Sequence, residues 1–196
     1  MKTLVASLAL LVVVVRCSPC PRGWNLFDRK SGGWCIGVFS GTVTRDAAEE
    51  ECQGRGATLS GIESAAERRQ VVQMAKASLQ SINQPNGAFW LGAKRKDNCM
   101  GTNYRSGDCI YNQFEWTDGE TEGVRGFYFR PGQPDNSQLN QNCLYMFVGE
   151  PNTPDRWGPN NPGEMDDSAC TYSFNNDFQN KIRAIQGFVC GRPAVS

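Results

Sequence analysis

The sequence of 196 residues contains no histidine, and this absence excludes several kinds of catalytic and metal site. Without histidine there is neither a Ser–His–Asp triad nor a Cys–His nucleophile pair, and no zinc site can use imidazole. General acid–base chemistry would depend on carboxylates, lysine or tyrosine. Charge of one sign is not in excess either, because 20 basic residues balance 20 acidic ones. The chain therefore has no net field that would attract nucleic acid.

Long apolar runs are missing beyond the first 17 residues, which read MKTLVASLALLVVVVRC. This segment has a basic start and an apolar stretch of 12 residues, 4–15. Such a stretch is typical of a signal peptide and is too short to cross a bilayer. We expect residues 1–17 to be a signal peptide that is cleaved before Ser18. The mature chain, residues 18–196, is then a secreted, extracellular protein without a membrane span.

The nine cysteines are an odd number, which the predicted signal peptide explains. Its cleavage removes Cys17 and leaves eight cysteines in a compartment where disulfides persist. Eight cysteines allow 105 pairings, so their number does not give the connectivity. Zinc is disfavoured because the mature part has no CxxC pair. Cleavage also removes two basic residues, so 18 basic against 20 acidic residues give a net charge of −2.

Two segments of the first half have the signals of helices. Residues 44–53 begin with Thr44 as a capping residue and have acidic residues near the positive end. Residues 64–80 begin with Ser64, and Glu67 follows at the capping-box spacing. Short apolar runs predict strands at residues 35–39, 89–93, 114–116, 127–129, 143–148 and 187–190.

The remaining segments predict a hairpin, a turn and two long loops. Cys20 and Cys35 enclose a Ser-Gly-Gly turn signal, which favours a hairpin. The basic cluster at residues 94–96 is expected to be a solvated turn. Residues 130–142 and 149–169 are polar with little periodicity, and loops of this length are usually functional. Two helices followed by a strand-rich second half indicate a single α+β domain.

Three polar segments place carboxylate or amide oxygens beside a proline or a cysteine. They are GQPDN (132–136), QNC (141–143) and MDDSAC (165–170). Oxygen ligands of this kind suit Ca²⁺. A cis peptide bond before Pro134 would direct Gln133 and Asp135 to the same side.

These segments and several others, in the same order, resemble the C-type lectin-like domain family. The family's first helix and next strand are matched by AAEEECQGRGATLSGIES, and its WIGL region is matched by FWLGAKR. The strand and long loop that follow are matched by FEWTDG and FRPGQPDN. The calcium-site strand is matched by NQNCLYM, the Trp-Asn-Asp-x-x-Cys motif by MDDSAC, and the closing strand by GFVC. The spacing agrees, since Gln141 and Cys143 lie seven and nine residues after Pro134. The resemblance covers most of the mature chain and implies the C-type lectin fold, with two helices, two small antiparallel sheets and a long calcium-binding loop region.

The resemblance also implies how the cysteines pair. It implies disulfides that join Cys20 to Cys35, Cys52 to Cys190, Cys99 to Cys109 and Cys143 to Cys170. The hairpin at residues 20–35 and the insert at residues 99–109 look like those of secreted invertebrate members.

The function that the resemblance implies is reversible sugar binding through one Ca²⁺. In sugar-binding members the side chains that hold the cation also hydrogen-bond two vicinal sugar hydroxyls, which complete its coordination. In this chain the corresponding metal and sugar ligands are Gln133, Asp135, Gln141, Asp166 and Asp167. The order Gln-Pro-Asp resembles galactose-binding members, so the expected partners are galactose-type glycans on microbial or host surfaces, with a role in innate immunity.

Three positions depart from the family pattern. Gln141 stands where glutamate is usual, and Asp166 stands where asparagine is usual. The two changes cancel in charge, so three carboxylates remain, which suffices electrostatically for Ca²⁺. Asp166 lacks the amide that would donate to a sugar. Met165 replaces the usual tryptophan, which affects packing more than chemistry.

An aromatic ring usually completes a galactose site by stacking on the sugar. Trp157, in the polar stretch PDRWGPNN, is the candidate for this ring. The alternative is that Trp157 belongs to a small cluster under the loop. Phe147 alternates within an apolar strand and is expected in the core.

Two other classes of function compete with a calcium-dependent lectin. One is a lectin-like domain that binds a protein or another non-sugar ligand without calcium. The other is a carboxylate-based hydrolase that uses Asp166 and Asp167. Adjacent carboxylates on one chain do not flank a substrate bond, and no proton donor is indicated, so we expect no enzyme.

Overall fold

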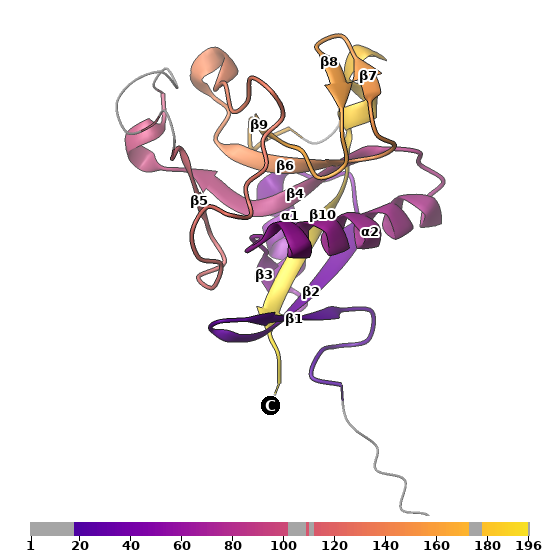
Figure 1. Cartoon of the computed structure of the whole chain (residues 1–196), viewed down its shortest axis with the longest axis vertical. Helices are drawn as coiled ribbons and strands as arrows, with labels where there is room; N and C mark the ends of the chain where they lie inside the picture. Colours follow the sequence, from indigo (N-terminus) through magenta and orange to yellow (C-terminus); the bar gives the residue numbers. More distant parts are fainter. Residues whose placement is uncertain (1–17, 102–108, 110–111, 173–177, 196) are drawn as a thin grey trace, which may run out of the picture.

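The computed structural model describes residues 18–101, 109, 112–172 and 178–195 (Figure 1). The predicted signal peptide and residues 102–108 of the predicted insert lie outside the described residues. Among the described residues, no helix has both the length and the apolar character needed to cross a membrane.

One sheet of eight strands organises the fold. Its strands are β1 (Asn25–Arg29), β2 (Gly32–Ser40), β3 (Thr58–Leu59), β4 (Gly87–Arg95), β5 (Phe114–Trp116), β6 (Cys143–Val148), β9 (Met165–Ser168) and β10 (Ile185–Pro193). The order is β1-β2-β10-β4-β6-β9, with β3 added on β10 and β5 on β4. Only β10 and β4 run parallel in this described sheet; the first strand, β1, lies at one edge, and the last strand, β10, lies in the middle part.

The two helices begin at the predicted capping residues. In α1 (Arg45–Gln53) the Thr44 hydroxyl accepts the N–H of Ala47, and in α2 (Ala65–Ser81) the Ser64 hydroxyl accepts the N–H of Glu67. These bonds satisfy helix donors that have no partner inside the helix. The helices and the strand-rich second half confirm the predicted α+β class.

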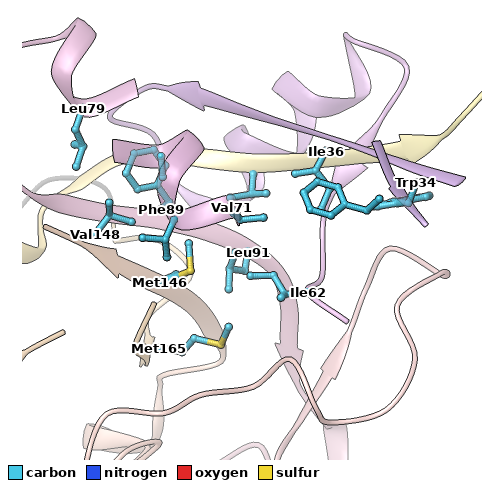
Figure 2. Packing of buried hydrophobic residues seen from close by; sticks show 14 residues of the cluster. Trp34, Ile36, Ile62, Val71, Leu79, Phe89, Leu91, Met146, Val148 and Met165 are labelled. Atoms are coloured by element: carbon cyan, nitrogen blue, oxygen red, sulfur yellow. The ribbon is translucent and has the colours of Figure 1, made fainter. Parts of the chain in front are cut away.

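The core lies on both faces of β4. Phe89 and Leu91 pack with side chains of α2, such as Val71, whereas Trp90 packs in a second cluster with Cys52 of α1. Figure 2 shows the first cluster, with Phe89 and Leu91 close to Val71 of the helix and to Met146 of β6. Alternate residues of a strand point to opposite faces, so this strand is buried on both sides.

Four disulfides brace the domain. They join Cys20 to Cys35, Cys52 to Cys190, Cys99 to Cys109 and Cys143 to Cys170, which are the pairs that the family resemblance implies. The second joins α1 to β10 across 138 residues of sequence. In the chain-entropy model a loop of this size stabilises the fold by about 4–5 kcal/mol.

Three expectations about the sheets were wrong. Residues 127–129 form no strand, because the bridge of Phe129 to Met165 is isolated and does not extend into a ladder; Phe127 stacks on Trp116 at 4.0 Å between ring centroids. Residues 149–169 are not one loop: they contain β9 and a hairpin of β7 (Thr153–Asp155) and β8 (Gly158–Asn160). Instead of two small antiparallel sheets, the described strands form one mixed sheet and this hairpin.

Candidate functional site

The long loop, residues 130–142, connects the region after β5 to β6. The Gln133–Pro134 peptide bond is cis, which is the geometry that would turn the neighbouring side chains to one side. Beyond it, Asn136, Gln138 and Leu139 have φ between 48° and 58°. Residues other than glycine adopt this left-handed region only when their surroundings hold them there. The loop therefore depends on contacts with the rest of the domain.

Asp167 of β9 supplies the central contact of the loop. Its side chain is fully buried. Oδ1 accepts the backbone N–H of Asp135 at 3.1 Å, and Oδ2 accepts that of Asn136 at 2.8 Å. Its own carbonyl accepts Nε2 of Gln141 at 3.0 Å. One residue of β9 thus binds both the start and the end of the loop.

Arg95, at the end of β4, neutralises Asp167. Its Nη2 lies 2.5 Å from Oδ2 of Asp167, and its Nε donates to the backbone oxygen of Gln141 at 3.0 Å. Nη1 donates to the side chain of Gln113, and the guanidinium lies 4.6 Å from the centre of the Phe114 ring. Burial raises the pKa of Asp167 to about 6, although Arg95 and the two loop N–H groups favour the ionised form.

Three further predicted ligands border this buried pair. Oε1 of Gln133 accepts the N–H of Asp135 at 2.9 Å. Oδ1 of Asp135 and Oε1 of Gln141 both accept the N–H of Ser137, at 3.0 and 2.6 Å. All three side chains are half-buried, so they border solvent around the turn at residues 135–137. The structure therefore brings Gln133, Asp135 and Gln141 together above Asp167.

Asp166 faces the other way. Adjacent residues of a strand point to opposite faces, and its Oδ2 accepts the hydroxyl of Tyr145 at 3.2 Å and Nη1 of Arg183 at 2.5 Å. Arg183 also forms an ion pair with Asp155 of β7 at 2.9 Å, and Asp155 binds Arg130 as well. Burial raises the pKa of Asp166 to about 7, against the attraction of Arg183.

The five predicted ligands, as the structure places them, do not fit a Ca²⁺ ion. Such an ion requires six to eight oxygens around one point. Asp166 faces away from the other four, and both carboxylate oxygens of Asp167 already receive loop N–H groups, with the Arg95 guanidinium beside them. The described residues also contain no group of three or more acidic or cysteine side chains that could hold a metal.

Sequence reasoning missed Arg95 and Arg183. The expectation that residues 94–96 form a solvated turn was wrong for Arg95, which is 1% exposed. The run continues β4, so the alternation of the strand directs Arg95 inward beside Asp167. That alternation was the available signal for Arg95, whereas nothing in the local sequence indicated the role of Arg183.

Trp157 lies at the turn of the β7–β8 hairpin and is 51% exposed. Its ring lies 3.9 Å from the guanidinium of Arg156 and 4.9 Å from that of Arg183. Phe147 is buried, as the alternation of its strand predicted. The long loop and this hairpin both extend from the end of the molecule opposite the C-terminus (Figure 1).

Comparison with known proteins identifies the family. The model of the family described as C-type lectin domain-containing protein 141/158 matches residues 21–193. The chain therefore belongs to the C-type lectin domain family, and its fold is the C-type lectin fold. Proteins of this family are generally binding proteins without enzymatic activity.

Two curated relatives match most of the chain. It is 27% identical over 175 residues, 88% of its length, to human versican core protein, but it spans only 4% of that protein. It is 32% identical over 155 residues to the snaclec agglucetin subunit alpha-1 of Deinagkistrodon acutus, which covers 72% of this chain and 92% of the snaclec.

Two solved structures share the fold. The cow carbohydrate-recognition domain of CD23, in the presence of a GlcNAc2Man3 oligosaccharide, has a TM-score of 0.57 and 20% identity, covering 92% of this chain and 100% of that one. A calcium-independent type II antifreeze protein has a TM-score of 0.54 and 21% identity, covering 93% and 100%. These likenesses are evidence for the fold alone.

Proposed function

We propose that this domain is a secreted lectin that binds glycans reversibly at the long loop and makes or breaks no covalent bond. The observation that carries the proposal is the group of half-buried polar side chains, Gln133, Asp135 and Gln141, on a loop that is held by the buried Asp167. A site that is ordered before binding loses less entropy when the ligand arrives. The oligosaccharide named with the CD23 domain supports a glycan as the ligand class.

The side chains of this group match the chemistry of sugar hydroxyls. A hydroxyl both donates and accepts, a carboxylate accepts, and an amide does both. Asp135 can therefore accept from one hydroxyl while Gln133 and Gln141 pair with its neighbour. The Gln-Pro-Asp order favours a galactose-type sugar, and the exposed ring of Trp157 is suited to stack on its apolar face.

The test is binding of the mature protein to immobilised galactose, glucose and mannose. We expect a preference for galactose, and Asp135→Asn should weaken binding about tenfold or more, because a hydrogen bond to a charged group contributes about 1.5–3 kcal/mol. Asp28→Asn is the matched control, since Asp28 is exposed on β1 at the other end of the molecule. Absence of binding to every glycan on a broad array, or equal binding by Asp135→Asn, would contradict the proposal.

A protein ligand is the second candidate, because the same end of the molecule also exposes apolar side chains. Leu139 on the long loop and Trp157 on the hairpin are each 51% exposed. Exposed apolar side chains next to polar groups are common at protein interfaces. Competition separates the two candidates: an excess of free galactose should abolish glycan binding and leave binding of a protein ligand unchanged.

A further inference from the structure

The cation below the long loop is a side chain of the protein itself. Arg95 is 1% exposed, and all three of its guanidinium nitrogens have acceptors, on Asp167, Gln141 and Gln113. The ring of Phe114 lies 4.6 Å from the guanidinium carbon. A buried cation is stable only when it is paired and hydrogen-bonded in this way.

Arg95 also connects the segments that form the site. Its backbone N–H donates to the carbonyl of Asn142 at 2.9 Å, and its Nε donates to the carbonyl of Gln141. Its Nη2 binds Asp167, whose carboxylate in turn accepts the N–H groups of Asp135 and Asn136. The end of β4, both ends of the long loop and β9 thus meet at one guanidinium–carboxylate pair.

The neighbouring carboxylate has an arginine of its own. Asp166 pairs with Arg183, which also pairs with Asp155 of the β7–β8 hairpin. The two adjacent carboxylates of β9 are therefore each neutralised by a guanidinium on its own face of the strand. No negative charge of this pair is left for a metal to balance.

We propose that Arg95 replaces Ca²⁺ as the cation that holds the long loop, so that the loop keeps its shape without metal, while Arg183 neutralises the adjacent carboxylate on the opposite face. The inference deepens the proposed function, and it rests on that function only where it predicts that glycan binding survives removal of metal. The contact of Arg95 with the long loop is a property of the protein alone, so it is tested without any sugar.

The first experiment compares the thermal unfolding of the mature wild-type protein in millimolar Ca²⁺ and in chelator. We expect the same midpoint and the same amide hydrogen exchange of residues 130–142 in both solutions. A ligand that binds the folded state must raise its stability. A midpoint several degrees higher in Ca²⁺, or faster exchange of the loop in chelator, would overturn the proposal.

The second experiment replaces the cation. Arg95→Met keeps much of the volume and removes the charge, and Lys94→Met is the matched control because Lys94, the preceding residue of β4, is only partly buried. We expect the first variant to exchange the amide hydrogens of residues 135–141 at least tenfold faster and the control to behave like the wild type. Equal protection in both variants would overturn the proposal, and if Arg95→Met does not fold, the wild-type comparison still decides.

The glycan assay separates this inference from the proposed function. Galactose binding that is equal in Ca²⁺ and in chelator supports both. No glycan binding, combined with an unfolding midpoint that does not respond to Ca²⁺, refutes the proposed function and leaves the role of Arg95 supported. A midpoint that rises in Ca²⁺ refutes the role of Arg95, whatever the glycan result.

Discussion

Asp166 and Asp167 are neighbours on β9, yet their carboxylates belong to two separate ion-pair networks. Asp167 pairs with Arg95 under the long loop, and Asp166 pairs with Arg183 on the other face of the strand. The alternation of side chains along a strand is the cause of this separation. In the sequence the two acids look like parts of one metal site. In the structure Asp167 holds the long loop, whereas Asp166 is linked through Arg183 to the β7–β8 hairpin.

The network of Asp166 predicts a large effect of removing Arg183. Arg183→Met leaves both Asp155 and Asp166 without this partner, and breaking a buried ion pair typically costs about 3–5 kcal/mol. Urea unfolding should show this loss in the free energy of unfolding. Arg125→Met, at an exposed position, is the control and should change stability by less than about 0.5 kcal/mol. Similar values for both variants would contradict the network.

Asp155 predicts a loss of stability in acid. Burial acts to raise its pKa, but the N–H of Trp157 and the guanidinium groups of Arg130 and Arg183 outweigh burial, so the pKa lies below its ordinary value. The unfolded chain then takes up this proton at a higher pH than the folded chain. The contribution of Asp155 is complete above about pH 4 and is lost as the pH falls through the folded pKa. Between pH 5 and pH 2 the free energy of unfolding should fall more steeply with decreasing pH for the wild type than for Asp155→Asn. The same pH dependence in both proteins would show that Asp155 does not contribute.

The disulfide between Cys143 and Cys170 joins the start of β6 to the segment just after β9, and so it closes the framework of the site. Replacing both cysteines with alanine should cost about 3–4 kcal/mol from loop entropy and should also weaken glycan binding. The double variant that lacks Cys99–Cys109 is the control, with a loss of about 2–3 kcal/mol for its shorter loop and no loss of binding. Urea unfolding and the galactose assay measure the two effects. Equal loss of binding in both variants would mean that general destabilisation, not the position of the bond, is responsible.

Trp157 predicts a change in binding without a large change in stability. Because its ring is half exposed, Trp157→Ala should lose only the cation–π contacts with Arg156 and Arg183, about 1 kcal/mol. Galactose binding should weaken more than this, since stacking on the sugar is lost too. Leu26→Ala, which removes an exposed apolar side chain at the other end of the molecule, should leave binding unchanged. Undiminished binding by Trp157→Ala would remove this ring from the site.

Local signals were sufficient for some elements of the fold and not for others. Thr44 and Ser64 mark the helix starts because a capping hydroxyl satisfies backbone donors only a few residues away. The apolar runs of β4 and β6 were visible for the same local reason. β9, β7 and β8 were not, because the middle of MDDS is two aspartates, which are buried in ion pairs, and TPD and GPN have low strand propensity.

The amino-acid sequence by itself determined the family, the α+β class and the helix caps, because these follow from short motifs and their spacing. The tertiary structure alone decided which cation stands beside the carboxylates. Arg95 and Asp167 are 72 residues apart in the sequence, and their pairing depends on how β4, β6 and β9 lie next to one another. A charge on a side chain is visible in a sequence, but its partner is set by the packing of distant strands.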